Sequence, residues 1–206
     1  MNKIIITIIT VLLISALSGC GNDQYAQEKE FWYLQRQANN IFRNPLATPP
    51  REMERVIGVL KDAISANPDT IMALELEFTI GRLYMAKEEF AESREQFSRI
   101  IEKYSDKANI VSEALFLIGY SYETSGNWGS ALETYRKIMK EHPNTSRGLD
   151  LPMYIARYYE KKYQPEKMVG AYKEAVVFYD SLVLRNPDSA FGYIASNMKA
   201  RSYSAL

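Results

Sequence analysis

The sequence predicts an all-α fold made of repeated helical hairpins. Turns that contain proline recur with a common signature, as Asn-Pro-Asp-Thr at 67–70, His-Pro-Asn-Thr at 142–145 and Asn-Pro-Asp-Ser at 186–189. With a weaker turn, Tyr-Ser-Asp at 104–106, the equivalent positions are 37, 38 and 44 residues apart. Proline stops a helix, and the Asn, Asp, Ser or Thr behind it can cap the next one. Recurrence at this spacing is typical of a repeat array.

Between the turns, apolar and small residues are spaced as they are on one face of a helix. The positions i, i+3, i+4 and i+7 of the central segment are Leu115, Ile118, Gly119 and Tyr122. This spacing predicts helices and excludes alternating strands. Behind this segment, Gly126 is suited to end one helix and Asn127 to cap the next.

The outer parts of the chain depart from the central spacing. Pro165 is expected to begin a long helix over about 165–186, and a first unit over about 24–68 carries an insertion between Asn44 and Pro50. The last stretch, about 188–203, is expected to be a capping helix, since terminal repeats of such arrays are often atypical. We therefore expect about four helical-hairpin units plus a C-terminal capping helix.

The third unit resembles the tetratricopeptide repeat. That family places a large residue, Leu-Gly, Tyr, Ala, Phe and Pro at fixed offsets. The matching residues here are Leu115, Ile118, Gly119, Tyr122, Ala131, Tyr135 and Pro143. The second unit matches through Ile80, Gly81, Tyr84, Ser93 and Phe97. The resemblance implies a tetratricopeptide-type solenoid, with small residues where two helices cross closely.

The first nineteen residues are typical of a secretory signal peptide. Lys3 precedes a mostly apolar stretch over 4–16, which is too short to span a bilayer as a helix. Leu-Ser-Gly-Cys at 17–20 resembles the lipobox of bacterial lipoproteins. We therefore expect a signal peptide over 1–19, a lipidated Cys20 with a short polar linker over 20–23, and a tetratricopeptide-repeat domain over 24–206.

The lipobox resemblance implies a covalent lipid at Cys20. In that family the thiol carries diacylglycerol, the new amino terminus is acylated, palmitate being a common acyl group, and the acyl chains anchor the protein stably. Gly21 stands where an Asp commonly retains such proteins in the inner membrane. The expected location is therefore the periplasmic face of the outer membrane, and no cofactor is expected besides the lipid.

A partner-binding groove is predicted on the concave face, which the first helix of each hairpin lines. Equivalent positions in successive units form an apolar row, and positions four residues further along share its face. The predicted groove residues are Phe78, Phe116 and Met153 in the first row and Arg82, Tyr120 and Arg157 in the second. Aromatic and Arg side chains are frequent at binding hot spots. The alternative is that the first row only packs against adjacent helices.

The composition gives no sign of catalysis. Cys20 is the single Cys, so a multi-Cys zinc site cannot form. The single His, His142, stands in a helix-ending His-Pro turn, which is typical of a surface turn residue. Lys and Arg together equal Asp and Glu, 25 each, which does not support nucleic-acid binding. We expect a protein that is not an enzyme and that binds other proteins.

Signal peptide, lipobox and repeats together resemble the BamD-type lipoproteins of the outer-membrane β-barrel assembly machinery. That resemblance implies a membrane-anchored scaffold whose partners are envelope proteins, a β-barrel assembly protein among them. Two other roles stay open: an adaptor for secretion or pilus complexes, and a coordinator of cell-envelope or division complexes.

Overall fold

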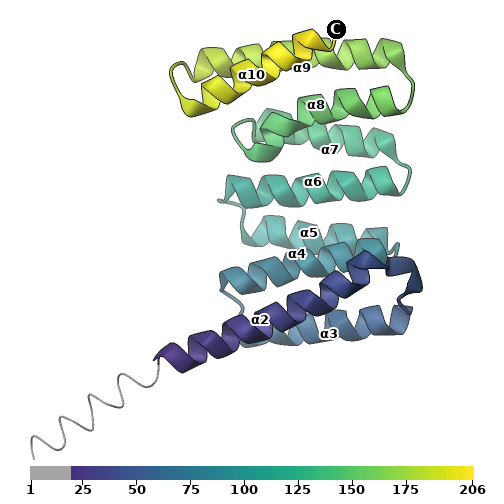
Figure 1. The fold of residues 1–206 in the computed structure, drawn as a ribbon, viewed down its shortest axis with the longest axis vertical. Helices are drawn as coiled ribbons and strands as arrows, with labels where there is room; N and C mark the ends of the chain where they lie inside the picture. Colours follow the sequence, from purple (N-terminus) through teal and green to yellow (C-terminus); the bar gives the residue numbers. More distant parts are fainter. Residues whose placement is uncertain (1–19) are drawn as a thin grey trace, which may run out of the picture. The chain divides into compact units, whose positions relative to one another are not determined.

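A computed structural model describes residues 20–206, so the predicted signal peptide lies outside the described residues. These residues form nine α-helices and one short 3-10 helix, with no strand, as predicted for an all-α fold (Figure 1). The chain divides between Lys87 and Glu88 into two compact units, each described by itself. Across the described residues, no helix has the length and apolar character that crossing a membrane requires.

The N-terminal unit packs three helices around one core. Its elements are α2 (Cys20–Arg43), η1 (Pro45–Ala47), α3 (Pro50–Ala66) and α4 (Ile71–Ala86). The core is built from all three α-helices; its members include Leu34, Ala38, Ile41, Val56, Leu60, Leu76, Ile80 and Leu83. The Asn44-Pro45 pair follows the end of α2, and the Pro49-Pro50 pair begins α3. The predicted insertion between Asn44 and Pro50 is therefore the connection that contains η1.

Helix α2 begins earlier than the sequence predicts. A polar linker was predicted over 20–23, whereas the backbone is already helical at Cys20 and stays helical to Arg43. No proline lies between these residues, so nothing in the covalent chain stops the helix before Asn44 and Pro45.

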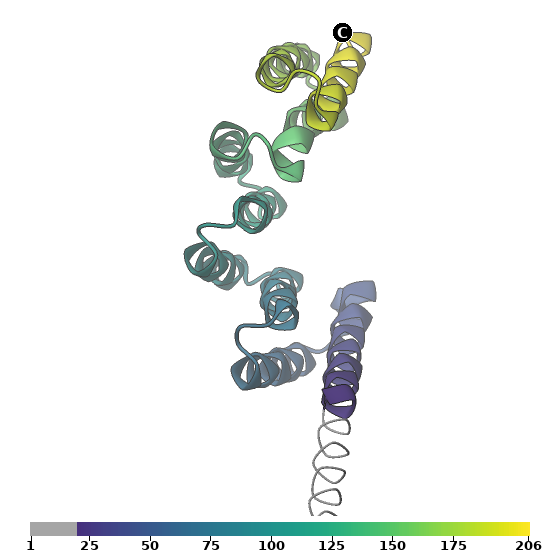
Figure 2. The same ribbon diagram turned by 90° about the vertical axis from the view of Figure 1, so that its left-hand side faces the viewer.

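The C-terminal unit is a stack of six helices. They are α5 (Phe90–Lys103), α6 (Ala108–Thr124), α7 (Trp128–Glu141), α8 (Ser146–Lys161), α9 (Pro165–Arg185) and α10 (Ala190–Ser204). Each helix packs against the next one in the chain, and α8 also contacts α6 and α10. Figure 2 shows most of these helices end-on: α6, α8 and α10 form one layer and α5, α7 and α9 the other. The predicted long helix at Pro165 and the predicted capping helix are both confirmed.

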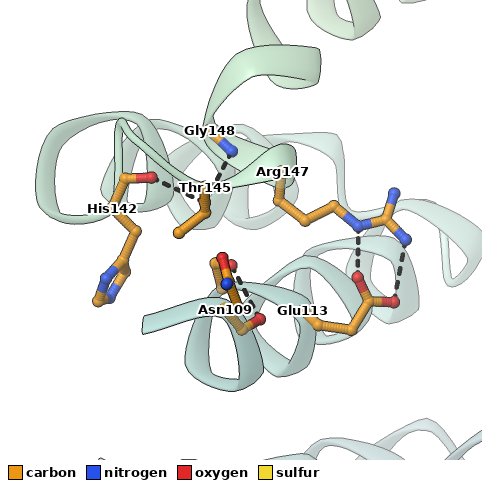
Figure 3. A network of polar contacts seen from close by, with 7 residues as sticks. Asn109, Glu113, His142, Thr145, Arg147 and Gly148 are labelled. Atoms are coloured by element: carbon orange, nitrogen blue, oxygen red, sulfur yellow. Dashed lines mark hydrogen bonds and ion pairs between the residues drawn. The ribbon is translucent and has the colours of Figure 1, made fainter. Parts of the chain in front are cut away.

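Three of the proline turns end in the same capping arrangement. In each, a hydroxyl donates to the carbonyl three residues before it and accepts from the amide three residues after it, at 2.8–3.1 Å. The hydroxyls belong to Thr70, Thr145 and Ser189, which precede α4, α8 and α10. Figure 3 shows the arrangement at Thr145, between the His142 carbonyl and the Gly148 amide. The predicted cap residues are confirmed at all three turns.

The predicted break and close crossing within the third unit are also present. Gly126 has a φ of +84°, a conformation that favours glycine, and the Asn127 side chain accepts from the Ser130 amide. Where α6 crosses α7, a methyl group on Gly119 would collide with the ring of Tyr135. Glycine at position 119 therefore allows the two helices to approach closely.

Candidate protein-binding surface

Two of the six predicted groove residues lie on α4, in the N-terminal unit. Phe78 is only 5% exposed, so its ring is a packing residue and not an accessible contact. Arg82 is half-buried, and its guanidinium carbon lies 5.8 Å from the centroid of the Phe78 ring. The expectation of an exposed apolar row is therefore wrong at Phe78, and the alternative of helix packing holds there.

Met153 on α8 is buried for a reason that lies far away in the sequence. It is 5% exposed, and the hydroxyl of Ser202 on α10 donates to its sulfur at 3.1 Å. The capping helix therefore covers the position that repeat equivalence assigns to the groove. Arg157, one turn further along α8, is exposed.

Phe116 and Tyr120 are brought together on α6. Their rings stack with centroids 6.3 Å apart and an interplanar angle of 13°. Tyr120 is 42% exposed, whereas Phe116 is half-buried beneath it and meets the Tyr154 ring of α8 edge-on at 5.9 Å. Of the predicted residues, these two make the accessible aromatic contact.

Arg147 extends this contact and was not predicted from the sequence. Its guanidinium carbon lies 3.8 Å from the centroid of the Phe116 ring, within cation–π range. Nε and one terminal nitrogen of Arg147 also donate to the two carboxylate oxygens of Glu113, at 2.5 and 2.9 Å (Figure 3). The Glu113 hydrogen bond raises the pKa of Arg147 further, so the charge is permanent. We name Phe116, Tyr120, Arg147 and Tyr154 the aromatic surface.

The half-buried carboxylate of Glu123 fixes the aromatic surface from below. The hydroxyls of Tyr135 and Tyr154 both donate to the same oxygen of Glu123, at 2.9 and 2.8 Å. Burial is the main cause that raises the pKa of both tyrosines, and the Glu123 charge adds to it. Both hydroxyls therefore keep their protons and remain donors at neutral pH, which holds the Tyr154 ring against Phe116.

A second aromatic group surrounds the turn between α6 and α7. Trp128 stacks on Tyr158 with centroids 3.3 Å apart, and its indole nitrogen donates to the Tyr159 hydroxyl at 3.2 Å. These contacts join α7 to α8 across one repeat. In the sequence, the Tyr-Tyr pair at 158–159 was a weak indication of these contacts. It did not indicate that Trp128 is the partner of both tyrosines.

The aromatic surface has the chemistry of a contact site for another protein. The exposed Tyr120 ring lies over the Phe116 ring, and a permanent cation is held against Phe116. Aromatic and Arg side chains are the residues that dominate binding hot spots. Among residues 20–206 no three His, Cys, Asp or Glu side chains are grouped so that they could hold a metal ion.

Residues 113–145 match the family model described as Tetratricopeptide repeat. The matched segment contains most of α6, all of α7 and the turn that Thr145 closes. No curated protein matches the chain. Tetratricopeptide repeats are typically non-enzymatic units that bind other proteins. Together the match and the helical hairpins identify a fold of the tetratricopeptide type.

Proposed function

We propose that this protein is a lipid-anchored scaffold of the cell envelope that takes part in outer-membrane protein assembly. Three features support the proposal. The repeat fold is a protein-binding class, the aromatic surface offers a contact to a partner, and the sequence at 17–20 resembles a lipobox. The lipid at Cys20 then keeps the scaffold beside the proteins that it holds.

The observation that carries this function is the exposed Tyr120 ring, stacked on Phe116 beside a fixed guanidinium. Because the Arg147 side chain is already held by Glu113, little conformational entropy is lost when a partner binds to it. An amphipathic helix or strand of a partner, with an apolar face for the rings and carboxylates near Arg147, is the matching ligand.

The test is co-purification from native membranes after mild detergent extraction and cross-linking. The proposed assembly role predicts that an outer-membrane β-barrel assembly protein and its accessory lipoproteins accompany the chain. Tyr120→Ala is expected to reduce their recovery. Tyr163→Ala is the matched control, because Tyr163 is an exposed tyrosine in the turn between α8 and α9.

Other proteins in the purified complex would redirect the proposal. Secretin or pilus proteins would assign the chain to the alternative role of a secretion adaptor, and peptidoglycan-linked or division proteins to an envelope coordinator. Loss of all partners with the Tyr163 variant as well as the Tyr120 variant would argue against the aromatic surface.

A further inference from the structure

Helix α2 presents two opposite faces with different chemistry. One face packs into the core of the N-terminal unit through Leu34, Ala38 and Ile41. At about 100° per residue, Tyr25, Lys29, Trp32 and Arg36 fall within an arc of about 60° on the opposite side of the helix. All four are exposed, Tyr25 to 67% and Trp32 to 60%. We name these four residues the α2 stripe.

Further exposed aromatic, basic and apolar side chains lie beside the α2 stripe and beyond its last residue. Tyr33, also exposed, stands beside it, and Arg43 extends it in the same direction two turns further along. In η1, directly behind the helix, Leu46 is almost completely exposed. The guanidinium carbon of Arg36 lies 5.3 Å from the centroid of the Trp32 ring, so cation and aromatic ring form one surface.

This combination of residues is the one that meets a lipid headgroup layer. Trp and Tyr concentrate at membrane interfaces, where the ring enters the acyl boundary and the polar edge stays hydrated. Lys29, Arg36 and Arg43 add three positive charges along the same line, with Glu28 at its margin. Basic residues beside a membrane anchor are attracted to anionic lipids. Trp, Tyr and Arg are also frequent in protein interfaces, so the residue types alone do not separate the two partners. The position of the stripe, directly behind the proposed lipid at Cys20, favours the bilayer.

We propose that the α2 stripe lies flat on the bilayer surface and binds anionic phospholipid headgroups. The inference rests on the proposed lipid at Cys20, which lies only five residues before Tyr25. At about 1.5 Å per residue, α2 is about 36 Å long, so a lipid at its first residue brings the whole stripe within reach of the headgroups. The stripe would then fix the orientation of the N-terminal unit on the membrane.

The test uses the two tryptophans of the chain, Trp32 and Trp128. The full lipidated protein is reconstituted into vesicles of phosphatidylethanolamine and phosphatidylglycerol whose acyl chains are brominated, since bromine quenches nearby indoles. The Trp128→Phe variant reports Trp32 alone, and Trp32→Phe reports Trp128 alone. We expect a loss of fluorescence from Trp32 and little loss from Trp128, which is half-buried against Tyr158.

A charge variant separates the stripe from the anchor. Lys29→Glu with Arg36→Glu changes two exposed side chains on the solvent side of α2, so folding is expected to be preserved. The variant chain should still float with the vesicles, because the lipid remains, while the quenching of Trp32 decreases. In the unchanged protein, quenching should decrease when phosphatidylglycerol is replaced by phosphatidylcholine.

Two results would overturn the inference in distinguishable ways. If the chain floats with the vesicles but Trp32 is not quenched, the stripe does not lie on the membrane, whereas the proposed anchor stands. If the chain does not float at all, the proposed anchor fails and the inference fails with it. A cross-link from position 32 to a protein in native membranes would also overturn the proposal that the stripe binds lipid.

Discussion

Gly119 illustrates how one residue permits a close approach of two helices. A methyl group there would meet the Tyr135 ring, and that ring cannot move aside easily. Tyr135 is fully buried, and its hydroxyl is held by Glu123 at 2.9 Å. The small residue of the repeat motif is thus needed for steric reasons between α6 and α7.

Gly119→Ala is therefore expected to lower the free energy of unfolding by about 1–3 kcal/mol, the usual cost of forcing extra volume into a packed core. Gly170→Ala is the matched control. Gly170 is exposed within α9 and a methyl group there meets no atom within 4 Å. Because Ala favours a helix over Gly, this control should raise stability by about 0.5–1 kcal/mol. Urea unfolding followed by circular dichroism measures both, and equal effects would refute the steric explanation.

Buried tyrosines predict how stability depends on alkaline pH. Burial raises the pKa of Tyr135, Tyr154 and Tyr179 in the folded protein above the ordinary value of 10.0. In the unfolded chain these hydroxyls ionise near pH 10, whereas in the folded protein they stay protonated. The stabilisation is complete below that pH and is lost as the pH rises above it.

We therefore expect the urea midpoint to stay nearly constant from pH 8 to 9.5, as far as these tyrosines are concerned, and to fall steadily above pH 10. Tyrosinate absorbance should show a late group of hydroxyls that ionises together with unfolding. If all 15 tyrosines ionise while the helices stay intact, the buried network does not hold as described.

Residues that look equivalent in sequence proved unequal in the structure. Phe116 and Met153 occupy the same repeat position, yet Phe116 is only half-buried and Met153 is covered by α10. Arg147 was missed because its partner Glu113 lies 34 residues away and its ring contact lies on another helix. Periodicity indicates which face of a helix a residue occupies, but not which distant element covers that face.

At the scale of the element, the proline turns carry local information that can be read directly. Each hydroxyl cap satisfies an amide that would otherwise lack a partner at the start of a helix, and the proline stops the helix before it. The weaker turn at 104–106 lacks this arrangement, because Lys107 stands at the cap position of α6 and makes no side-chain cap. Helix boundaries were therefore predictable where the signature was complete.

Thr145→Ala is expected to lower the free energy of unfolding by about 1–2 kcal/mol, since the Gly148 amide loses its acceptor at a buried site. Thr124→Ala serves as the control. Its exposed hydroxyl bonds only to a carbonyl within its own helix, so the change should have little effect. A Thr145 variant as stable as the Thr124 variant would show that the cap contributes nothing.

The start of α2 shows where element prediction failed. The short polar residues at 21–23 were interpreted as a linker. Core contacts of Leu34 and Ile41 hold the later part of α2, and the helix extends from there to Cys20, because adding a residue to an existing helix is easier than starting a new one.

At the scale of the whole molecule, the proposed anchor can be tested by a single substitution. Cys20→Ser should abolish incorporation of labelled palmitate and release the chain from the membrane fraction at high salt, because the thiol that accepts the lipid is gone. Circular dichroism should show unchanged helix content. Palmitate labelling that persists in the variant would contradict the proposal that Cys20 carries the lipid.

The fold class follows from repeated short-range patterns, whereas the partner depends on a surface that several helices build together. The aromatic surface joins α6 and α8. The Phe116–Tyr120 stack lies within α6, whereas the contacts of Phe116 with Tyr154 and Arg147 require the packing of both helices. For this reason the protein-binding class could be inferred from the sequence, while the accessible residues could be chosen only with the structure.

Site-specific photo-cross-linking in living cells tests whether the aromatic surface holds an outer-membrane assembly partner, as we propose. A photoreactive amino acid replaces Tyr120 on the aromatic surface or, as the control, the exposed Lys137 on α7. We expect a covalent product with an outer-membrane β-barrel assembly protein from position 120 and none from position 137. A barrel product from position 137 alone, or no barrel product from position 120, would contradict it.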